Sequence, residues 1–169
     1  QKAAKKTNMP EGVFSMVHAT SHEIGSYLVT HPITQAVGFT GSYRGGKALF
    51  DLAVRRPQPI PVYAEMGSIN PVVLLSEKIK NSGEALAEGL SQSVCMGVGQ
   101  FCTNPGLLIL LNSDEGFLDL LASRLNTMPL GTFLTKGIKD AYANGTKSLA
   151  NHTGVQQLTS ADLPSPALF

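Results

Sequence analysis

The chain has 169 residues, a length typical of one domain or of parts of two, and 43% of them are hydrophobic, which is enough for a sizeable core. Its 13 Lys and Arg residues nearly balance its 12 Asp and Glu residues, so neither nucleic acid nor an anionic membrane is predicted as a partner. Two cysteines are too few for a disulfide framework, and no signal peptide or apolar run of about 20 residues occurs, so the sequence favours a cytoplasmic protein.

The first part of the chain alternates short apolar runs with helix-like segments. A Ser or Thr cap and an early acidic residue mark the first long helix, and His31-Pro32 would end it. The predicted order is a strand at 13–17, a helix at 20–30, a strand at 35–40, a glycine-rich turn at 41–46 and a helix at 47–56.

The rest of the chain continues this alternation after a proline-rich connection. The predicted order is a strand at 62–65, a turn at 66–68, a strand at 71–75, a helix at 84–99, a strand at 107–111, helices at 114–125 and 136–149, and the start of a strand at 165–169. Strands that alternate with helices predict an α/β fold, a three-layer α/β/α arrangement with a mostly parallel sheet covered on both faces.

The glycine-rich turn Gly41–Gly46 lies between a predicted strand and a predicted helix. Backbone N–H groups and the positive end of the helix dipole face an anion at such a place, and glycines let the backbone approach it closely. The spacing differs from the G-x-G-x-x-G of common dinucleotide folds. The turn is therefore interpreted either as a phosphate cradle or as a plain strand-to-helix connection.

Cys102 lies between a helix-like run and a Pro-Gly turn, so a loop would expose its thiol to a substrate. A free cysteine is most often a small buried hydrophobic residue, and that interpretation fits Cys95, which lies within helix-like sequence. For Cys102 the polar and turn-forming neighbours favour exposure. A nucleophilic role would need a depressed pKa or a nearby base.

Glu65 ends an otherwise apolar strand, immediately before a turn. A carboxylate in that position is either a salt-bridged structural residue or a base in a cleft, where desolvation raises its pKa toward neutrality. His18, His22 and Glu23 have the composition of a metal site, but their spacing is not H-E-x-x-H and no third ligand is obvious. No metal is predicted.

Three motifs, taken in order, resemble those of the aldehyde dehydrogenase superfamily. The matching segments are Phe39-Thr40-Gly41-Ser42 followed by Gly46 (F-T-G-S-x-x-x-G), Ala64-Glu65-Met66-Gly67 with Asn70-Pro71 (E-L-G-G-K-x-P), and Gly99-Gln100-Phe101-Cys102 (G-Q-x-C). The resemblance spans roughly residues 10–111. Ser68 and Ile69 replace the usual Gly and Lys, and both are similar to the branch that contains α-ketoglutaric semialdehyde (2,5-dioxopentanoate) dehydrogenases and NADP-dependent fatty aldehyde dehydrogenases.

The resemblance implies NAD(P)-dependent oxidation of an aldehyde to a carboxylic acid through a cysteine thioester. Cys102 would be the nucleophile, with its own backbone N–H holding part of the oxyanion, and Glu65 would be the general base. The residues implied to contact the cofactor, NADP or NAD, are Gly41, Ser42, Gly46 and Met66. The implied substrate is α-ketoglutaric semialdehyde or an aliphatic aldehyde.

The same resemblance implies that the chain is an internal segment of a longer enzyme. Residues 1–66 would be the C-terminal part of the dinucleotide-binding domain and residues 67–169 the N-terminal part of the catalytic domain. Family motifs expected on either side are absent from the chain, so the segment alone is predicted to be inactive. The full-length enzyme is expected to be a homo-oligomer.

Three alternatives remain from the residues. Family members that pass the acyl group to coenzyme A tend to lack the base glutamate, so Glu65 counts against them. A catalytically incomplete fragment or paralogue could act as a binding or structural piece, although such a piece has no need of both Cys102 and Glu65. A thiol hydrolase would need a histidine near Cys102, and His152, the only later histidine, has no supporting motif.

Overall fold

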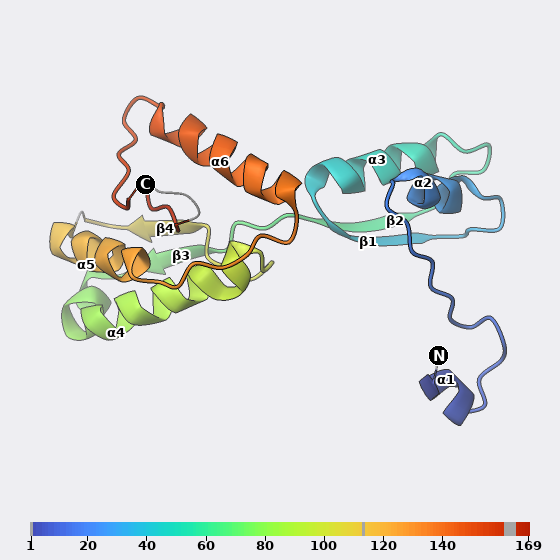
Figure 1. The fold of residues 1–169 in the computed structure, drawn as a ribbon, viewed down its shortest axis with the longest axis horizontal. Helices are drawn as coiled ribbons and strands as arrows, with labels where there is room; N and C mark the ends of the chain where they lie inside the picture. The colour runs from blue at the N-terminus through green and yellow to red at the C-terminus, as the bar shows by residue number, and fades with distance from the viewer. Residues whose placement is uncertain (1, 113, 161–164) are drawn as a thin grey trace. The chain divides into compact units, whose positions relative to one another are not determined.

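The computed structural model describes residues 2–112, 114–160 and 165–169. The chain divides into two compact units, Gln1–Gly67 and Ser68–Phe169, each with its own two-stranded parallel sheet. Figure 1 shows these sheets and the helices that accompany them. The α/β class with parallel strands, predicted from the alternation of strands and helices, is confirmed.

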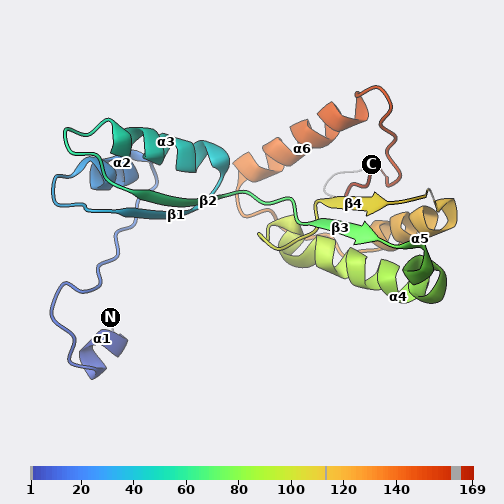
Figure 2. The same cartoon turned by 180° about the vertical axis from the view of Figure 1, so that it is seen from behind.

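The first unit contains one pair of parallel strands with a helix between them in the chain. Its elements are α1 (Lys2–Lys6), α2 (Glu23–Thr30), β1 (Val37–Gly41), α3 (Tyr43–Val54) and β2 (Val62–Met66). β1 and β2 pair in parallel with Thr40 opposite Glu65 and Gly41 opposite Met66. Figures 1 and 2 show α2 and α3 on one face of this sheet.

A small core and one arginine hold the first unit together. Val29, Ala53 and Ile60 are buried between the helices and the strands. The half-buried Arg56 donates hydrogen bonds to the carbonyl oxygens of Val29, His31, Pro32 and Thr34 at 2.9–3.3 Å. The guanidinium therefore satisfies carbonyls at the end of α2 and in the segment leading to β1, which no helix or strand partner would bond.

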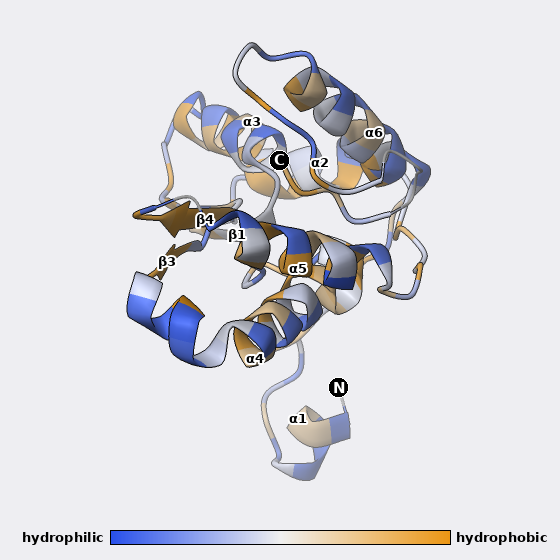
Figure 3. Ribbon diagram, turned by 90° about the vertical axis from the view of Figure 1, so that its left-hand side faces the viewer, coloured by the Kyte–Doolittle hydropathy of each residue, from blue (hydrophilic) through white to orange (hydrophobic). Residues whose placement is uncertain are grey.

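The second unit has the larger core. Its elements are β3 (Pro71–Leu74), α4 (Ser76–Cys95), a short 3-10 helix η1 (Met96–Gly99), β4 (Leu107–Leu110), α5 (Glu115–Asn126) and α6 (Lys136–Ala150). β3 and β4 pair in parallel, and Figure 3 shows both as strongly hydrophobic strands. The buried residues of the core are Leu74, Ile79, Ala87, Leu90, Phe117, Leu121 and Leu125.

Within the described residues, each sheet has one face that packs against helices and one face whose side chains are exposed. In the first unit Tyr63 is 71% exposed, and in the second unit Val73 is 57% exposed. These side chains alternate with inward residues such as Val62 and Leu74, as the two-residue repeat of a strand requires. The alternation shows that α3 covers one side of β2 and that α4 and α5 cover one side of β3, with the opposite sides open.

Two predicted strands are wrong. Residues 13–17 form no strand, and Val13, Phe14, Met16 and Val17 are all more than half exposed. A strand needs a neighbour to accept its hydrogen bonds, and no described strand pairs with this segment. Residues 165–169 also form no strand; the Leu168 N–H instead donates to the Thr159 hydroxyl at 2.9 Å, and its carbonyl accepts from Leu158 N at 2.8 Å.

Several predicted helix boundaries are also wrong. α2 begins at Glu23 after His22, without a side-chain cap, and α3 begins at Tyr43 because Ser42 caps it, so most of the predicted glycine turn is helical. α4 begins at Ser76 and is broken at Ser82 (φ −148°), just before the predicted start at Glu84. The other elements lie within two residues of their predicted positions. None of the described helices combines the length and apolarity that crossing a membrane requires.

Candidate active site

The turn after β1 is the first turn of a capped helix. Ser42 has an extended backbone (φ −71°, ψ 151°), and its hydroxyl oxygen accepts a hydrogen bond from Gly45 N at 3.1 Å. Helix geometry leaves the N–H groups of Tyr43 and Arg44 without intrahelical partners, and both residues are exposed. These two unpaired amides, together with the guanidinium of Arg44, form a set of donors suited to an anion such as a pyrophosphate.

The glycines of this turn let two side chains lie directly beneath it. A Cβ on Gly41 would lie 2.7 Å from the Phe39 ring, and one on Gly45 would lie 3.0 Å from it. A Cβ on the buried Gly46 would overlap Cγ and Sδ of Met66. From the sequence, these glycines were interpreted as letting the backbone approach a phosphate closely. In the structure they also leave room for Phe39 and Met66 to pack under α3.

Glu65 lies at the same edge of the sheet as this turn. In parallel strands the carboxyl ends meet at one edge, and Gly67 N donates to Gly41 O at 3.2 Å, which ties the end of β2 to the end of β1. The side chain of Met66 points toward α3, whereas Glu65 is on the exposed face. Within its own unit Glu65 forms no ion pair with a described residue, so the salt-bridged interpretation of this carboxylate gains no support.

In the second unit Cys102 is exposed on the loop that precedes β4. The 3-10 helix η1, which precedes this loop, contains three successive left-handed residues, Gly97, Val98 and Gly99, with φ of 60°, 61° and 70°. Glycine adopts this conformation readily, whereas the β-branched Val98 is strained in it. The Val98 side chain lies against Gly131, where a Cβ would overlap it. Packing therefore holds a strained backbone four residues before the thiol.

Polar groups from the start of β3 reach the carbonyl of Cys102. The Ser68 hydroxyl donates to Cys102 O, and Asn70 Nδ2 donates to Cys102 O at 2.7 Å and to Asn104 O at 2.9 Å. Asn104 Nδ2 in turn donates to Val94 O at 3.1 Å and Met96 O at 2.8 Å. These contacts connect the Cys102 loop both to the amino end of β3 and to the end of α4.

The second cysteine has a different environment. Cys95 is half-buried at the end of α4, and burial raises the pKa of its thiol above the ordinary value. Burial likewise raises the pKa of Tyr142, whose hydroxyl donates to Ser165 O at 2.7 Å. Both residues line a small, mostly apolar cavity of about 120 Å³. Cys95 thus matches the structural interpretation made from its helix-like sequence.

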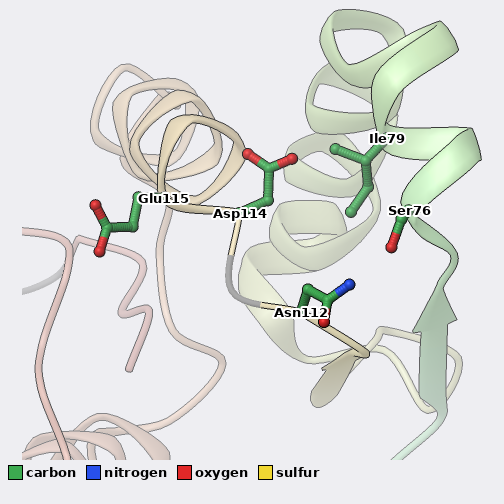
Figure 4. Close-up of a pocket in the computed structure, with 5 residues that line it drawn as sticks. All are labelled: Ser76, Ile79, Asn112, Asp114 and Glu115. Atoms are coloured by element: carbon green, nitrogen blue, oxygen red, sulfur yellow. The ribbon is translucent and has the colours of Figure 1, made fainter.

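A separate pocket lies at the opposite edge of the β3–β4 sheet from Cys102. It measures about 470 Å³ and follows the carboxyl ends of β3 and β4, where Ser76, Ile79, Asn112, Asp114 and Glu115 line it (Figure 4). The Asp114 carboxylate in this pocket caps α5, since it accepts a hydrogen bond from Phe117 N at 3.0 Å. Across residues 2–112, 114–160 and 165–169, no group of three or more His, Cys, Asp or Glu side chains is placed to bind a metal.

The family of the chain follows from comparison with known proteins. The profile of the aldehyde dehydrogenase family matches residues 1–146. This chain belongs to the aldehyde dehydrogenase family.

Curated relatives within this family include two α-ketoglutaric semialdehyde dehydrogenases. One, from Azospirillum brasilense, is 49% identical over 162 residues, and the match covers 95% of this aldehyde dehydrogenase chain and 31% of the relative. The other, from Acinetobacter baylyi, is 40% identical over 166 residues, with 97% and 31% coverage. The chain therefore spans about a third of the length of these relatives.

Solved aldehyde dehydrogenase structures share its fold. A NAD-dependent benzaldehyde dehydrogenase from Corynebacterium glutamicum has a TM-score of 0.80 at 21% identity, covering 98% of this chain and 38% of that protein. An indole-3-acetaldehyde dehydrogenase mutant from P. syringae, solved in complex with NAD+ and IAA, has a TM-score of 0.79 at 19% identity, with 95% and 34% coverage.

The structure brings the candidate residues of this aldehyde dehydrogenase chain together in two groups. Gly41, Ser42, Gly46 and Met66 gather with Glu65 at the carboxyl edge of the first sheet, and Cys102 lies before the amino edge of the second. The contacts that Ser68, Asn70 and Asn104 make in and around the Cys102 loop were not predicted from the sequence. The available signal was Ser68, which departs from the common glycine, but its spacing from Cys102 alone could not have indicated a hydrogen bond 34 residues away.

Proposed function

We propose that the protein containing this chain oxidises an aldehyde to a carboxylic acid with a nicotinamide cofactor, and that Cys102 is its nucleophile and Glu65 its general base. The observation that carries the proposal is the exposed thiol on a loop held at its backbone, in a chain of the aldehyde dehydrogenase family that retains a free carboxylate at Glu65. The first unit would belong to the cofactor domain and the second to the catalytic domain.

The proposed reaction begins at the thiol. Cys102, as the thiolate, attacks the aldehyde carbon, and the carbonyl oxygen becomes an oxyanion. The Cys102 N–H donates to no described residue, so it is available to hold that oxygen. A carbon–sulfur bond forms and the carbonyl π bond is replaced by a C–O⁻ single bond, so the charge passes from sulfur to oxygen.

When bound, a nicotinamide cofactor, NAD or NADP, would supply the hydride acceptor needed for a thioester to form on Cys102. The donor set at the start of α3 fits the pyrophosphate of such a cofactor, because the free amides of Tyr43 and Arg44 and the Arg44 guanidinium all carry partial or full positive charge. Ser42 keeps its oxygen in the helix cap, and its hydroxyl proton remains available to a phosphate oxygen.

Glu65 completes the cycle by accepting a proton from water. The water oxygen attacks the thioester carbon, the carbon–sulfur bond breaks, and the products are the carboxylic acid and the restored thiolate. The position of Glu65 at the end of β2, on the exposed face and free of an ion pair within its unit, leaves its carboxylate available for that step. The substrate proposed first is α-ketoglutaric semialdehyde, the substrate named for the two curated relatives.

Steady-state assays test this function. We expect the full-length protein to produce NADH or NADPH when supplied with α-ketoglutaric semialdehyde, and to lose that activity in the Cys102→Ala variant. The Cys95→Ala variant is the matched control and should keep turnover, because Cys95 is half-buried outside the Cys102 loop. Full turnover by Cys102→Ala, or none by the folded wild-type protein with semialdehyde, aliphatic and aromatic aldehydes and both cofactors, would contradict the proposal.

A further inference from the structure

We infer that Ser68 and Asn70 are positioning residues for Cys102: together they clamp its backbone carbonyl and so fix the direction of the thiol and of the adjacent N–H. The inference deepens the proposed function and rests on it for the catalytic consequence. Its physical basis, a carbonyl held by two side chains, is independent of the reaction.

The carbonyl oxygen of Cys102 accepts two hydrogen bonds, and both donors lie in the same short segment of the chain. A carbonyl oxygen has two lone pairs, and here one receives the Ser68 hydroxyl and the other receives Asn70 Nδ2 at 2.7 Å. Both donors come from the short segment before β3, and Cys102 precedes β4, the parallel neighbour of β3. Because the amino ends of parallel strands meet at one edge, the sheet itself brings the clamp to the loop.

The backbone of the clamp is itself fixed. Asn70 has a left-handed conformation, with φ of 47°, which asparagine tolerates better than most residues. Directly before it, Ile69 O accepts from Gly106 N at 2.7 Å, and a Cβ at Gly106 would lie 2.9 Å from that oxygen. The clamp segment and the end of the Cys102 loop are therefore joined by backbone as well as by side chains.

Asn70 also forms a hydrogen bond with the part of the loop that follows Cys102. Its second contact is to Asn104 O at 2.9 Å, and the side-chain amide of Asn104 donates in turn to Val94 O near the end of α4 and to Met96 O at the start of η1. These carbonyls would otherwise lack intrahelical partners. One chain of hydrogen bonds thus runs from Asn70 through the nucleophile loop to the end of α4, which restricts the loop on both sides of the thiol.

The two donors are expected to be partly redundant in holding the Cys102 carbonyl. Because they share one acceptor, loss of either leaves the other in place, and the effect of losing both should exceed the product of the single effects. In the full-length protein we expect Ser68→Ala or Asn70→Asp to lower kcat about 3- to 10-fold and the double variant about 100-fold or more, from the usual strength of hydrogen bonds. The aldehyde KM should change less than about twofold, since a positioning defect acts on the reacting geometry.

The variants are chosen to keep the fold. Asn70→Asp preserves size and tolerance of the left-handed backbone while it replaces the donor with a carboxylate oxygen that the carbonyls of Cys102 and Asn104 repel, so its effect includes that repulsion. Ser68→Thr retains the hydroxyl and should keep kcat within about twofold of the wild-type value. Asn144→Asp and Ser148→Ala, at exposed residues of α6 in the same unit, are the matched controls for changes of the same type.

Two further measurements separate the clamp from the proposed function. Hydrogen–deuterium exchange of the peptide covering residues 99–106 and alkylation of Cys102 by iodoacetamide both report on the loop whether or not aldehyde is the true substrate. The clamp predicts faster exchange of this peptide and an altered Cys102 alkylation rate in the double variant. Unchanged exchange, alkylation and kcat, or a kcat that falls only in proportion to the fraction folded, would overturn it. Failure of the proposed function would instead appear as full turnover in Cys102→Ala.

Discussion

Gly46→Ala is expected to destabilise the protein, although glycine-to-alanine changes inside helices usually stabilise. An alanine in a helix interior is favoured over glycine by about 1 kcal/mol. At Gly46, however, the new methyl group would overlap the Met66 side chain and lie 3.2 Å from the Phe39 ring. Overpacking of this kind costs about 1–3 kcal/mol. We therefore expect a net loss of stability of about 0–2 kcal/mol, the difference between these two effects.

Gly89→Ala is the matched control. Gly89 lies inside α4 and is exposed, and a Cβ there would meet nothing within 4 Å. Because the helix preference is common to both changes, the difference between the two variants isolates the overpacking cost of about 1–3 kcal/mol. Urea denaturation of the full-length protein measures both values. A Gly46→Ala variant as stable as Gly89→Ala would refute the packing of Met66 under α3.

The same substitution carries a functional consequence. Met66 is the neighbour of Glu65, and Gly46 lies in the first turn of α3 beside the candidate pyrophosphate donors. Displacement of Met66 should therefore raise the KM for the nicotinamide cofactor. Met66→Ala should relieve the overlap, so the double variant should lose less stability than the two single losses combined, with a coupling of about 0.5–3 kcal/mol.

Three other predictions concern the thiols, the arginine and the helix cap. Near neutral pH iodoacetamide should modify the exposed Cys102 before Cys95, because burial shields the Cys95 thiol and raises its pKa above the ordinary value, which lowers its thiolate fraction. Equal rates at neutral pH, measured by peptide mass spectrometry, would contradict the burial argument. Arg56→Met should destabilise the protein by about 1–3 kcal/mol because four carbonyls lose a charged donor, whereas Arg55→Met, an exposed neighbour, should shift the melting temperature little; similar shifts would refute the role of Arg56. Ser42→Ala should cost about 1 kcal/mol through loss of the cap to Gly45 and raise the cofactor KM, with Ser42→Asp retaining the cap but repelling the cofactor; a Ser42→Asp variant that binds the cofactor normally would exclude a phosphate at this turn.

Periodicity predicted the elements that depend on local chemistry. The strand at 107–111 is a continuous apolar run, the strand at 62–65 is apolar up to Glu65 and is followed by a turn, and the helix at 114–125 has an acidic cap, so sequence and structure agree there within two residues. The start of α3 was missed because its first turn contains two glycines, which favour a turn by composition, while Ser42 supplies the cap that makes the helix form. The strand at 13–17 failed for a different reason, since pairing depends on a partner that local sequence does not reveal.

In the candidate site, too, some features follow from local sequence and others depend on the pairing of strands. The positions of Cys102 on a loop and of Glu65 at a strand end follow from turn residues near each, and the structure has both there. The contacts of Ser68, Asn70 and Asn104 depend on the parallel pairing of β3 with β4, which brings together segments more than 30 residues apart. No local pattern encodes that proximity, so only the fold could indicate that the residues before β3 hold the residue proposed as the nucleophile.

The most direct test of the central claim is a pre-steady-state burst experiment, with substrate and cofactor in excess, on the Glu65→Gln variant of the full-length protein. With α-ketoglutaric semialdehyde and the preferred cofactor, the account predicts a burst of about one NAD(P)H per Cys102, little further turnover, and an acyl adduct on the peptide that carries Cys102, because acylation proceeds while hydrolysis lacks its base. Steady turnover at the wild-type rate, or an adduct on Cys95 instead, would contradict the assignment of Cys102 as nucleophile and Glu65 as base.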